Sequence, residues 1–388
     1  MNLKEFEQIP IVFLQGAGRS GCDLLRTLLD NHDEIVVLPF NDKFNSIWIK
    51  NELNFESNVD EVVEKVLYSS KLVNFKQDFF INMGARQDYS MINWDSYEEF
   101  FRQFLSKNNV CSRNVRLAIY YAFAKVLKKD FQKLKIIIAD GYYSDYTNFI
   151  IKDFPGARFI HILKDHRSNI YSLKEYYRRS LGTLYPIYGT VKNVFFNILE
   201  DCMITNMKML HRNKKIFKER LKIVKHEDIV TAPEKTISSL CRWLNVEFNK
   251  KVLETTRIGK PSLSSSPFNK SGITGINPEF AIRWRTEMSS TEIRMIEFLF
   301  DNSMNALGYK SIYPKSFSNK MYGLLACFLP WRGELLPHKE ALKQSRLGRI
   351  HPTLFFLKYF AYLANNLFMY PINRCRLLYQ LVLNRYKF

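Results

Sequence analysis

The feature that most constrains the fold is an apolar run that passes through glycines into an amphipathic stretch, residues 10–31 (PIVFLQGAGRSGCDLLRTLLDN). Residues Ile11 to Gln15 predict a buried strand. Leu24, Leu25, Leu28 and Leu29 recur at helical spacing after the glycine-rich turn. A strand that turns directly into a helix is the opening unit of an α/β fold.

The same alternation continues along the chain. Short apolar runs predict further strands at Lys135 to Ala139, Arg158 to Leu163 and Leu221 to Lys225. Helical patterns follow or separate them, at Tyr146 to Phe154, Pro233 to Leu244, Phe280 to Glu287 and Ser290 to Leu307. We therefore expect a central parallel sheet within one domain of residues 1–310. Aromatic residues at helical spacing between about 45 and 130 predict inserted helices that cover a site.

Composition and cysteine spacing narrow the class of protein. Hydrophobic residues make up 46% of the chain and charged residues 24%, which excludes a wholly disordered or low-complexity protein. The six cysteines lie far apart, with no CxxC pair and no histidine at zinc spacing, so we expect neither a disulfide framework nor a metal site. The N-terminus shows no secretion signal or anchor, and we expect a cytoplasmic protein.

The glycine-rich turn, residues 16–21, predicts a phosphate site. Its backbone amides and the helix N-terminus converge on one spot, with Arg19 as a cation and Ser20 as a hydroxyl donor. A plain tight turn is the alternative. The pattern of magnesium-dependent nucleotide hydrolases, GxxxxGK[ST], would place Cys22 at its lysine and Asp23 at its metal-binding hydroxyl. Both diagnostic residues are missing, which favours a phosphate site that works without magnesium.

A second candidate phosphate site follows the strand that ends at Leu163. Lys164 would leave the strand at the edge where open α/β sheets bind ligands, and Ser172 would lie on the next helix. A cation and a hydroxyl at those places could hold one terminal phosphate. A basic turn before a solvated helix is the alternative interpretation.

These segments together resemble the sulfotransferases that use 3′-phosphoadenosine 5′-phosphosulfate (PAPS). The segment QGAGRSGCDLLRTLLDNH is similar to the family's 5′-phosphosulfate loop, and FPGARFIHILKDHRSNIYSLK to its 3′-phosphate segment. Two more stretches, KIVKHEDIVTAPEKTISSLCRWLNVEF and RWRTEMSSTEIRMIEFLFDNSMNALGY, match its later motifs in the same order. The resemblance covers about residues 10–310 and is closest to the bacterial and tyrosylprotein-like branch. It implies a P-loop-like sulfotransferase fold.

The resemblance also implies residue roles. Arg19 would stabilise charge on the oxygen between sulfur and phosphorus, and Gly18, Ser20 and Gly21 would cradle the 5′-phosphate. Lys164 and Ser172 would hold the 3′-phosphate, and no metal would be needed. Where the family has Thr-Thr, this chain has Cys22 and Asp23 in the donor-binding loop, and the carboxylate would repel the donor unless it points away. Asp23 could instead favour the helix N-terminus.

The resemblance does not identify a general base. Relatives place a glutamate shortly after the second strand, where this chain has Phe40, with Asp42 as the nearest carboxylate. We predict that Asp42 takes the acceptor proton; an ordinary surface aspartate in a turn is the alternative. His32 is predicted to be a structural cap after the first helix, and His161 a core histidine within a strand.

The C-terminal segment, residues 311–388, carries 12 Lys and Arg against two acids, a net charge of +10 out of +19 for the chain. Its stretches 321–331 and 353–372 are aromatic and apolar. We expect a basic helical extension that lies in the interface of an anionic membrane, with packing on the α/β core as the alternative. No recognition motif supports a nucleic-acid partner.

The resemblance implies an enzyme that moves a sulfuryl group from PAPS to a hydroxyl. A basic tail without a Golgi-type anchor suggests a bacterial enzyme on the inner face of the membrane, and from this setting, rather than from a motif, we infer a glycan or lipid-linked glycan as the acceptor. A binding protein that has lost catalysis on the same fold is the alternative, motivated by Cys22, Asp23, Gly141 and the missing glutamate. A nucleoside kinase, which would require ATP and magnesium, is a third possibility.

Overall fold

The computed structural model describes residues 3–39, 58–68, 92–142, 146–176, 203–262 and 275–329, together with Phe44, Leu199 and eight single positions between 353 and 379. Its contacts divide the chain into two units. The first comprises Met1–Leu163 and Asn213–Pro278, and the second Lys164–Arg212 and Glu279–Phe388. The predicted division at residue 310 stays a prediction.

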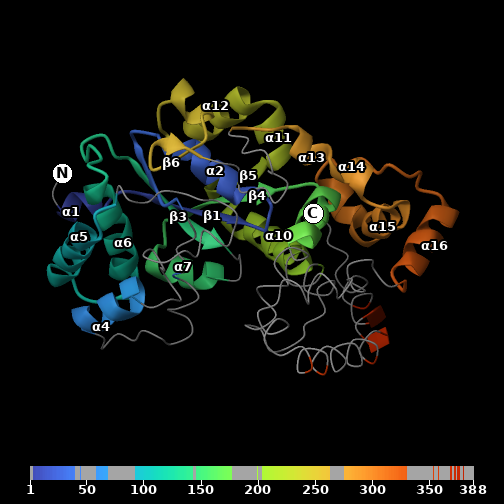
Figure 1. The fold of residues 1–388 in the computed structure, drawn as a ribbon, viewed down its shortest axis with the longest axis horizontal. Helices are drawn as coiled ribbons and strands as arrows, with labels where there is room; N and C mark the ends of the chain where they lie inside the picture. The colour runs from blue at the N-terminus through green and yellow to red at the C-terminus, as the bar shows by residue number, and fades with distance from the viewer. Residues whose placement is uncertain are drawn as a thin grey trace. The chain divides into compact units, whose positions relative to one another are not determined.

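The first unit is built on a five-stranded parallel sheet, which confirms the α/β class (Figure 1). The strand order is β2-β3-β1-β4-β5, and every neighbouring pair is parallel. The strands are β1 (Ile11–Gly16), β2 (Ile35–Val37), β3 (Ile136–Tyr142), β4 (Arg158–Leu163) and β5 (Leu221–Lys225). A separate antiparallel pair, β6 (Thr256–Arg257) and β7 (Lys260–Pro261), follows later in the chain.

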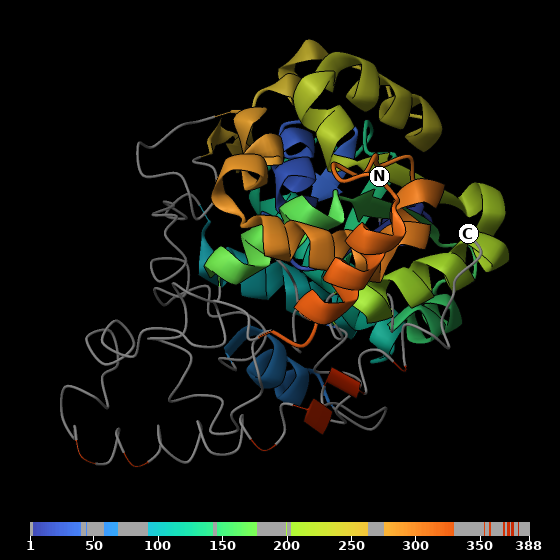
Figure 2. The same cartoon turned by 90° about the vertical axis from the view of Figure 1, so that its right-hand side faces the viewer.

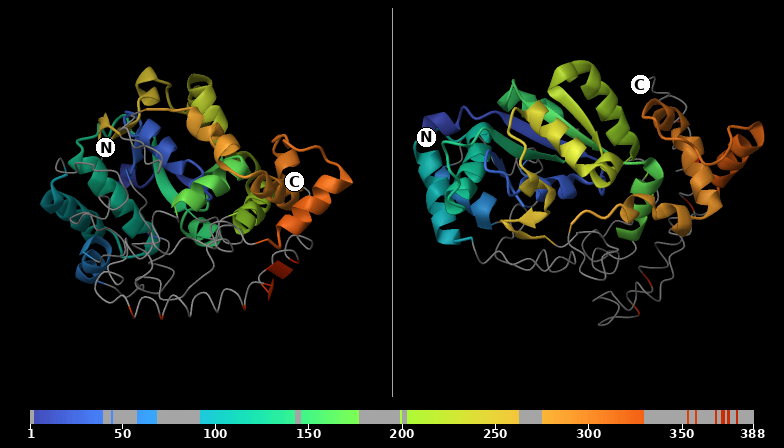
Figure 3. Two further views of the ribbon diagram at one scale, coloured as in Figure 1. Left: turned by 45° about the vertical axis from the view of Figure 1, so that its right-hand side comes forward. Right: turned by 90° about the horizontal axis from the view of Figure 1, so that it is seen from above.

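Helices cover both faces of this sheet, which explains why β1 is buried along its whole length. Val12 and Leu14 point to the face packed by α2 (Cys22–Leu29) and α12 (Pro233–Leu244). Ile11 and Phe13 point to the opposite face, with α5 (Trp94–Ser106), α6 (Ser112–Val126) and α7 (Thr147–Asp153). In the right panel of Figure 3, seen from above, α12 lies over the strands. Alternation along a strand thus builds two cores from one sequence.

Further elements complete the first unit. They are α1 (Leu3–Phe6), α4 (Val59–Val63) with the π-helix η1 (Glu64–Tyr68), α10 (Thr205–Phe217), the 3₁₀-helices η4 (Lys218–Arg220) and η5 (Lys250–Leu253), and α11 (His226–Thr231). One of them, α10, begins in the second unit and continues into the first at Asn213. The predicted inserted helices are present as α4, α5 and α6, and α12 begins and ends at the predicted residues.

The second unit is helical in its described part. Residues 166–176 form a helix, followed later by α13 (Glu279–Ile282), α14 (Trp284–Glu287), α15 (Ser290–Ala306) and α16 (Phe317–Ala326). The single helix predicted over Phe280 to Glu287 is two short helices separated by Arg283. A reciprocal capping box between Ser289 and Glu292 starts α15, and its backbone is kinked at Phe300.

The predicted C-terminal helices fall mostly outside the described residues, apart from α16 and single positions such as Leu357 and Phe368. Within the part of the chain that the structure describes, every helix is too short or too polar to span a bilayer.

Candidate active site

The loop that follows β1 has the backbone of an anion-binding nest. Arg19 and Gly21 both adopt the left-handed conformation, with φ of 63° and 114°, and the Ser20 amide donates to the Ala17 carbonyl at 3.1 Å. Helix α2 begins immediately afterwards at Cys22, and Gly21 has no side chain with which to cap its first amides. The loop therefore presents backbone N–H groups and the positive end of a helix dipole to one spot.

Two glycines are required because this loop lies tightly against its neighbours. A Cβ on Gly16 would come within 2.4 Å of Ser20 Oγ and 3.0 Å of the Ile162 carbonyl oxygen on β4. A Cβ on Gly21 would come within 2.5 Å of His226 Cδ2, at the start of α11. His226 was missed as a neighbour of the loop, although its place directly after β5 puts it at the same edge of the sheet as the end of β1.

Both predicted site segments leave the sheet at its carboxyl edge. Gly16, the last residue of β1, lies opposite Ile162 on β4 in the parallel register. The chain leaves β4 at Leu163 and continues into Lys164, as predicted. In open parallel sheets this edge is the ordinary place for a ligand.

Cys22 contributes to the loop as a neutral thiol. Burial raises its pKa to about 11. Its Sγ lies 3.6 Å from Ser20 Oγ, so the two side chains pack together beside the nest. A thiol in this state is a poor nucleophile, and what Cys22 can offer an anion is its backbone amide at the first position of α2.

The carboxylate of Asp23 is paired. Its Oδ2 accepts a hydrogen bond from Arg257 Nη2 at 2.6 Å, and Arg26 Nη1 lies 3.9 Å from Oδ1. Arg257 is buried and also donates to the Pro39 carbonyl and, at 3.2 Å, to Ser262 Oγ. From the sequence, Asp23 was expected either to repel the donor or to favour the helix N-terminus. Its pairing with Arg257 was not predicted.

Arg26 has a structural role beneath the loop. Its Nη2 lies 3.0 Å from Asp140 Oδ1, and both side chains are buried. Burial opposes the charged form of Arg26, but the Asp140 carboxylate more than compensates and the net effect raises its pKa. Two charges buried together in this way hold α2 to the end of β3.

In the second unit, the segment from Lys164 to Leu173 is buried throughout, so the alternative of a solvated helix is wrong. Arg167 donates to Asp165 Oδ2 at 2.6 Å and to Glu297 Oε1 at 2.5 Å. Its guanidinium also lies 4.3 Å from the ring centroid of Trp284. Arg167 therefore anchors the segment to α15 and α14.

His166 is held on α15 as a neutral side chain. Burial lowers its pKa to about 4. Ser303 Oγ, which donates to the Phe300 carbonyl, lies 3.0 Å from His166 Nε2, so the two side chains are hydrogen-bonded. Lys164 and Ser172 are buried, and Ser172 lies on the helix of residues 166–176, as predicted.

The remaining predicted residues divide into two groups. His161 is fully buried in β4, where burial lowers its pKa to about 4, and His32 bridges the Glu247 carbonyl and the Glu34 amide. The prediction for His161 is confirmed. His32 is structural, but its ring links the residue before β2 to Glu247 instead of capping the first helix. Phe40 and Asp42 lie outside the described residues. Among the described residues, no group of three or more His, Cys, Asp or Glu side chains is arranged to hold a metal ion.

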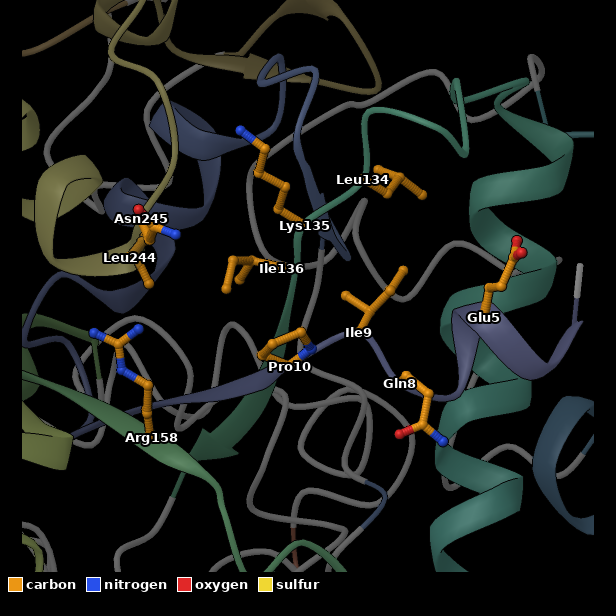
Figure 4. Close-up of a pocket in the computed structure, with 10 residues that line it drawn as sticks. All are labelled: Glu5, Gln8, Ile9, Pro10, Leu134, Lys135, Ile136, Arg158, Leu244 and Asn245. Carbon is orange, nitrogen blue, oxygen red and sulfur yellow. The ribbon is translucent and has the colours of Figure 1, made fainter. Parts of the chain in front are cut away.

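A crevice of about 480 Å³ lies at the opposite, amino edge of the sheet (Figure 4). Ile9, Pro10 and Ile136 line it with the cations Lys135 and Arg158. Lys135 is paired with Glu34, and the Arg158 guanidinium stacks 3.7 Å from the Trp243 ring centroid. Its cations are thus engaged, and the crevice contains none of the predicted site residues.

Comparison with known proteins gives the class. A sequence model described as the sulfotransferase family matches residues 10–250, more than half of the chain. The protein-tyrosine sulfotransferase of Drosophila melanogaster is 20% identical over 298 residues, 74% of this chain and 49% of that protein. This chain therefore spans about half the length of that relative.

Solved structures of sulfotransferase domains are also similar to this chain. The domain from the curacin biosynthetic pathway has a TM-score of 0.46 at 17% identity and covers 78% of this chain and 98% of its own. The domain from the Synechococcus PCC 7002 olefin synthase has a TM-score of 0.41 at 18% identity and covers 72% and 89%.

The match over residues 10–250, more than half of the chain, places it in the sulfotransferase family.

Proposed function

We propose that this protein transfers a sulfuryl group from PAPS to a hydroxyl of a glycan or lipid-linked glycan. The observation that carries the proposal is the nest after β1, in which left-handed Arg19 and Gly21 precede the uncapped start of α2. An anion with several oxygens suits such a nest, because each amide can donate to a different oxygen.

The residues of the nest divide the work. Gly18, Gly21 and Cys22 supply backbone N–H groups to the 5′-phosphate, and Ser20 adds its hydroxyl. Arg19 stabilises the negative charge that develops on the bridging oxygen as the bond from that oxygen to sulfur breaks. The acceptor oxygen forms the new bond to sulfur, and its proton passes to Asp42. The chemistry resembles loose phosphoryl transfer, where positioning and electrostatics dominate.

Lys164 and Ser172 hold the 3′-phosphate in this proposal. Lys164 follows directly after β4, at the edge where open parallel sheets bind ligands, and its ammonium group suits a terminal phosphate. Its neighbour Arg167 is paired with Asp165 and Glu297 and therefore has a structural role.

Calorimetry with 3′,5′-adenosine bisphosphate (PAP), the desulfated product, and with AMP tests the donor assignment. We expect PAP to bind at least tenfold more tightly than AMP, and Lys164→Ala to remove most of that preference. Arg19→Ala should weaken both ligands. A kinase would instead bind ATP with magnesium, and equal affinity for PAP and AMP would contradict the proposal.

Activity separates the enzyme from a binding protein on the same fold. We expect labelled sulfate to pass from PAPS to a component of cell-envelope extract. Asp42→Asn should slow single-turnover transfer by about a hundredfold, the contribution typical of a positioned base. A rate within about threefold of wild type would remove Asp42 from this role.

The proposed location is the cytoplasmic face of a membrane, with residues 311–388 as the peripheral contact. The net charge of +10 in this segment supports it, because anionic lipids attract clustered Lys and Arg.

A further inference from the structure

Helix α16 packs on α15 through its small residues. Gly323, Ala326 and Cys327 are buried, and a Cβ on Gly323 would come within 2.6 Å of Phe298 Cβ and 2.9 Å of the Arg294 carbonyl oxygen. Figure 2 shows the two helices alongside one another. The inner face of α16 is therefore made of residues that contribute little hydrophobic area.

The bulky apolar residues of α16 point the other way. Phe317 is 81% exposed and Leu325 60% exposed, and Leu329 just beyond the helix is 53% exposed. Met321, Tyr322 and Phe328 belong to the same outward surface. A helix at a protein–water boundary ordinarily directs its large apolar residues inward. Here the order is reversed, which is expected of a surface that meets something other than water.

Exposed apolar side chains are frequent throughout this part of the sequence. Most of the large exposed hydrophobic residues in the described part of the chain come after residue 311. Besides the six named above, they are Ile312, Leu357, Phe368, Ile372 and Tyr379.

The positive charge near α16 indicates which kind of partner binds this outward surface. Residues 311–333 contain Lys315, Lys320 and Arg332 and no acid, and Lys315 is paired with Asp301 at 2.9 Å. At the rim, the Arg294 guanidinium lies 4.6 Å from the Tyr322 ring centroid. A second copy of the chain would bring like charge to like charge, whereas an anionic lipid surface would be attracted. A ten-residue helix, about 15 Å long, can lie in the headgroup region with its apolar face downward.

We infer that the outward surface of α16, formed by Phe317, Met321, Tyr322, Leu325, Phe328 and Leu329, inserts into the interface of an anionic membrane. The inference rests on the proposed membrane location and names the helix that makes the contact.

The test uses the full chain and vesicles of phosphatidylcholine, with or without phosphatidylglycerol. We expect wild type to sediment with the anionic vesicles and the double variant Phe317→Ser, Leu325→Ser to partition at least tenfold less, since two exposed apolar side chains are removed. The matched control is Phe149→Ser on α7, where the side chain is 50% exposed. The control should stay within about twofold of wild type.

An unchanged partition of the double variant overturns the inference. Light scattering then tests the alternative partner. If wild type is a dimer and the double variant is a monomer with unchanged vesicle binding, a second copy of the chain covers α16 and the inference is also overturned. PAP binding on the same samples reports separately on the proposed function: retained PAP affinity with lost vesicle binding supports the inference. Failure of wild type to bind PAP refutes the donor assignment alone.

Discussion

The loop of residues 16–21 and the segment of residues 164–172 each follow a strand of the same parallel sheet, yet they are built in different ways. The loop presents its backbone, shaped by two left-handed residues and continued by the amides of α2. The segment is a run of buried side chains tied to α14 and α15. The loop is thus formed mainly by backbone groups, and the segment mainly by contacts between buried side chains.

The comparison shows that the cations in these two segments do not all have the same role. Arg26 under the loop and Arg167 in the segment are both committed to buried carboxylates. Arg19 and Lys164 are the cations that we assign to the donor. Sequence patterns present all four as equivalent positive charges, so substitutions that separate stability from donor binding test the distinction.

The largest effect is expected at Arg167. Arg167→Leu leaves Asp165 and Glu297 buried without their cation, which costs about 3–5 kcal/mol of unfolding free energy. Urea denaturation of the full chain measures it. The matched control is Arg283→Leu, which removes a largely exposed pair with Glu287 at 3.7 Å and should cost less than about 1 kcal/mol. Equal losses in the two variants would contradict the structural role of Arg167.

Substitution of Arg19 should have the opposite effect, with a large loss of activity and little loss of stability. Arg19→Ala is expected to lower kcat by about a hundredfold to a thousandfold, as loss of one transition-state donor does elsewhere. Its unfolding free energy should change by less than about 1 kcal/mol. Arg26→Leu serves as the comparison, because it leaves Asp140 buried and should destabilise the fold by several times that amount. Destabilisation by Arg19→Ala would place Arg19 with the structural cations.

Much of the fold could be predicted from the sequence, because β1, β4 and α12 carry strong local patterns of apolar residues, glycine and proline. The placement of Lys164 after a strand followed from the same patterns. What could not be predicted were partners far apart in the chain. Asp23 meets Arg257 and Arg167 meets Glu297 across 234 and 130 positions, and no local pattern records such pairs.

The two buried histidines should make the stability of the protein depend on pH. Burial keeps the folded-state pKa of His161 and of His166 at about 4, below the ordinary value of 6.5. As pH falls, the unfolded chain takes up these protons first, so stability is complete above about pH 6.5 and is lost towards pH 4.

The measurable consequence is a slope of up to about 1.4 kcal/mol per pH unit from each histidine within that window. Urea denaturation between pH 5 and pH 7 measures it. His166→Gln should reduce the slope by up to one such contribution and leave that of His161. An unchanged slope would show that His166 does not remain neutral in the folded protein.

The smallest effect concerns the Asp23 carboxylate, which follows the loop that we propose to bind the donor. Arg257→Gln removes the hydrogen bond that Asp23 Oδ2 accepts at 2.6 Å and should weaken PAP binding by about tenfold, because less positive charge then offsets the carboxylate near the proposed phosphate. Adding Asp23→Asn in the same chain should restore affinity to within about threefold of wild type.

Rescue is the decisive feature, because Arg257 also donates to the Pro39 carbonyl and to Ser262. If Arg257 acts only by holding those groups, Asp23→Asn cannot repair the defect, and the double variant should bind PAP no better than Arg257→Gln. Calorimetry at low and high salt adds a second measure. Repulsion between the Asp23 carboxylate and the ligand phosphate is screened by salt, so the difference in PAP affinity between Arg257→Gln and wild type should narrow as salt rises. A difference caused by a displaced backbone should not narrow.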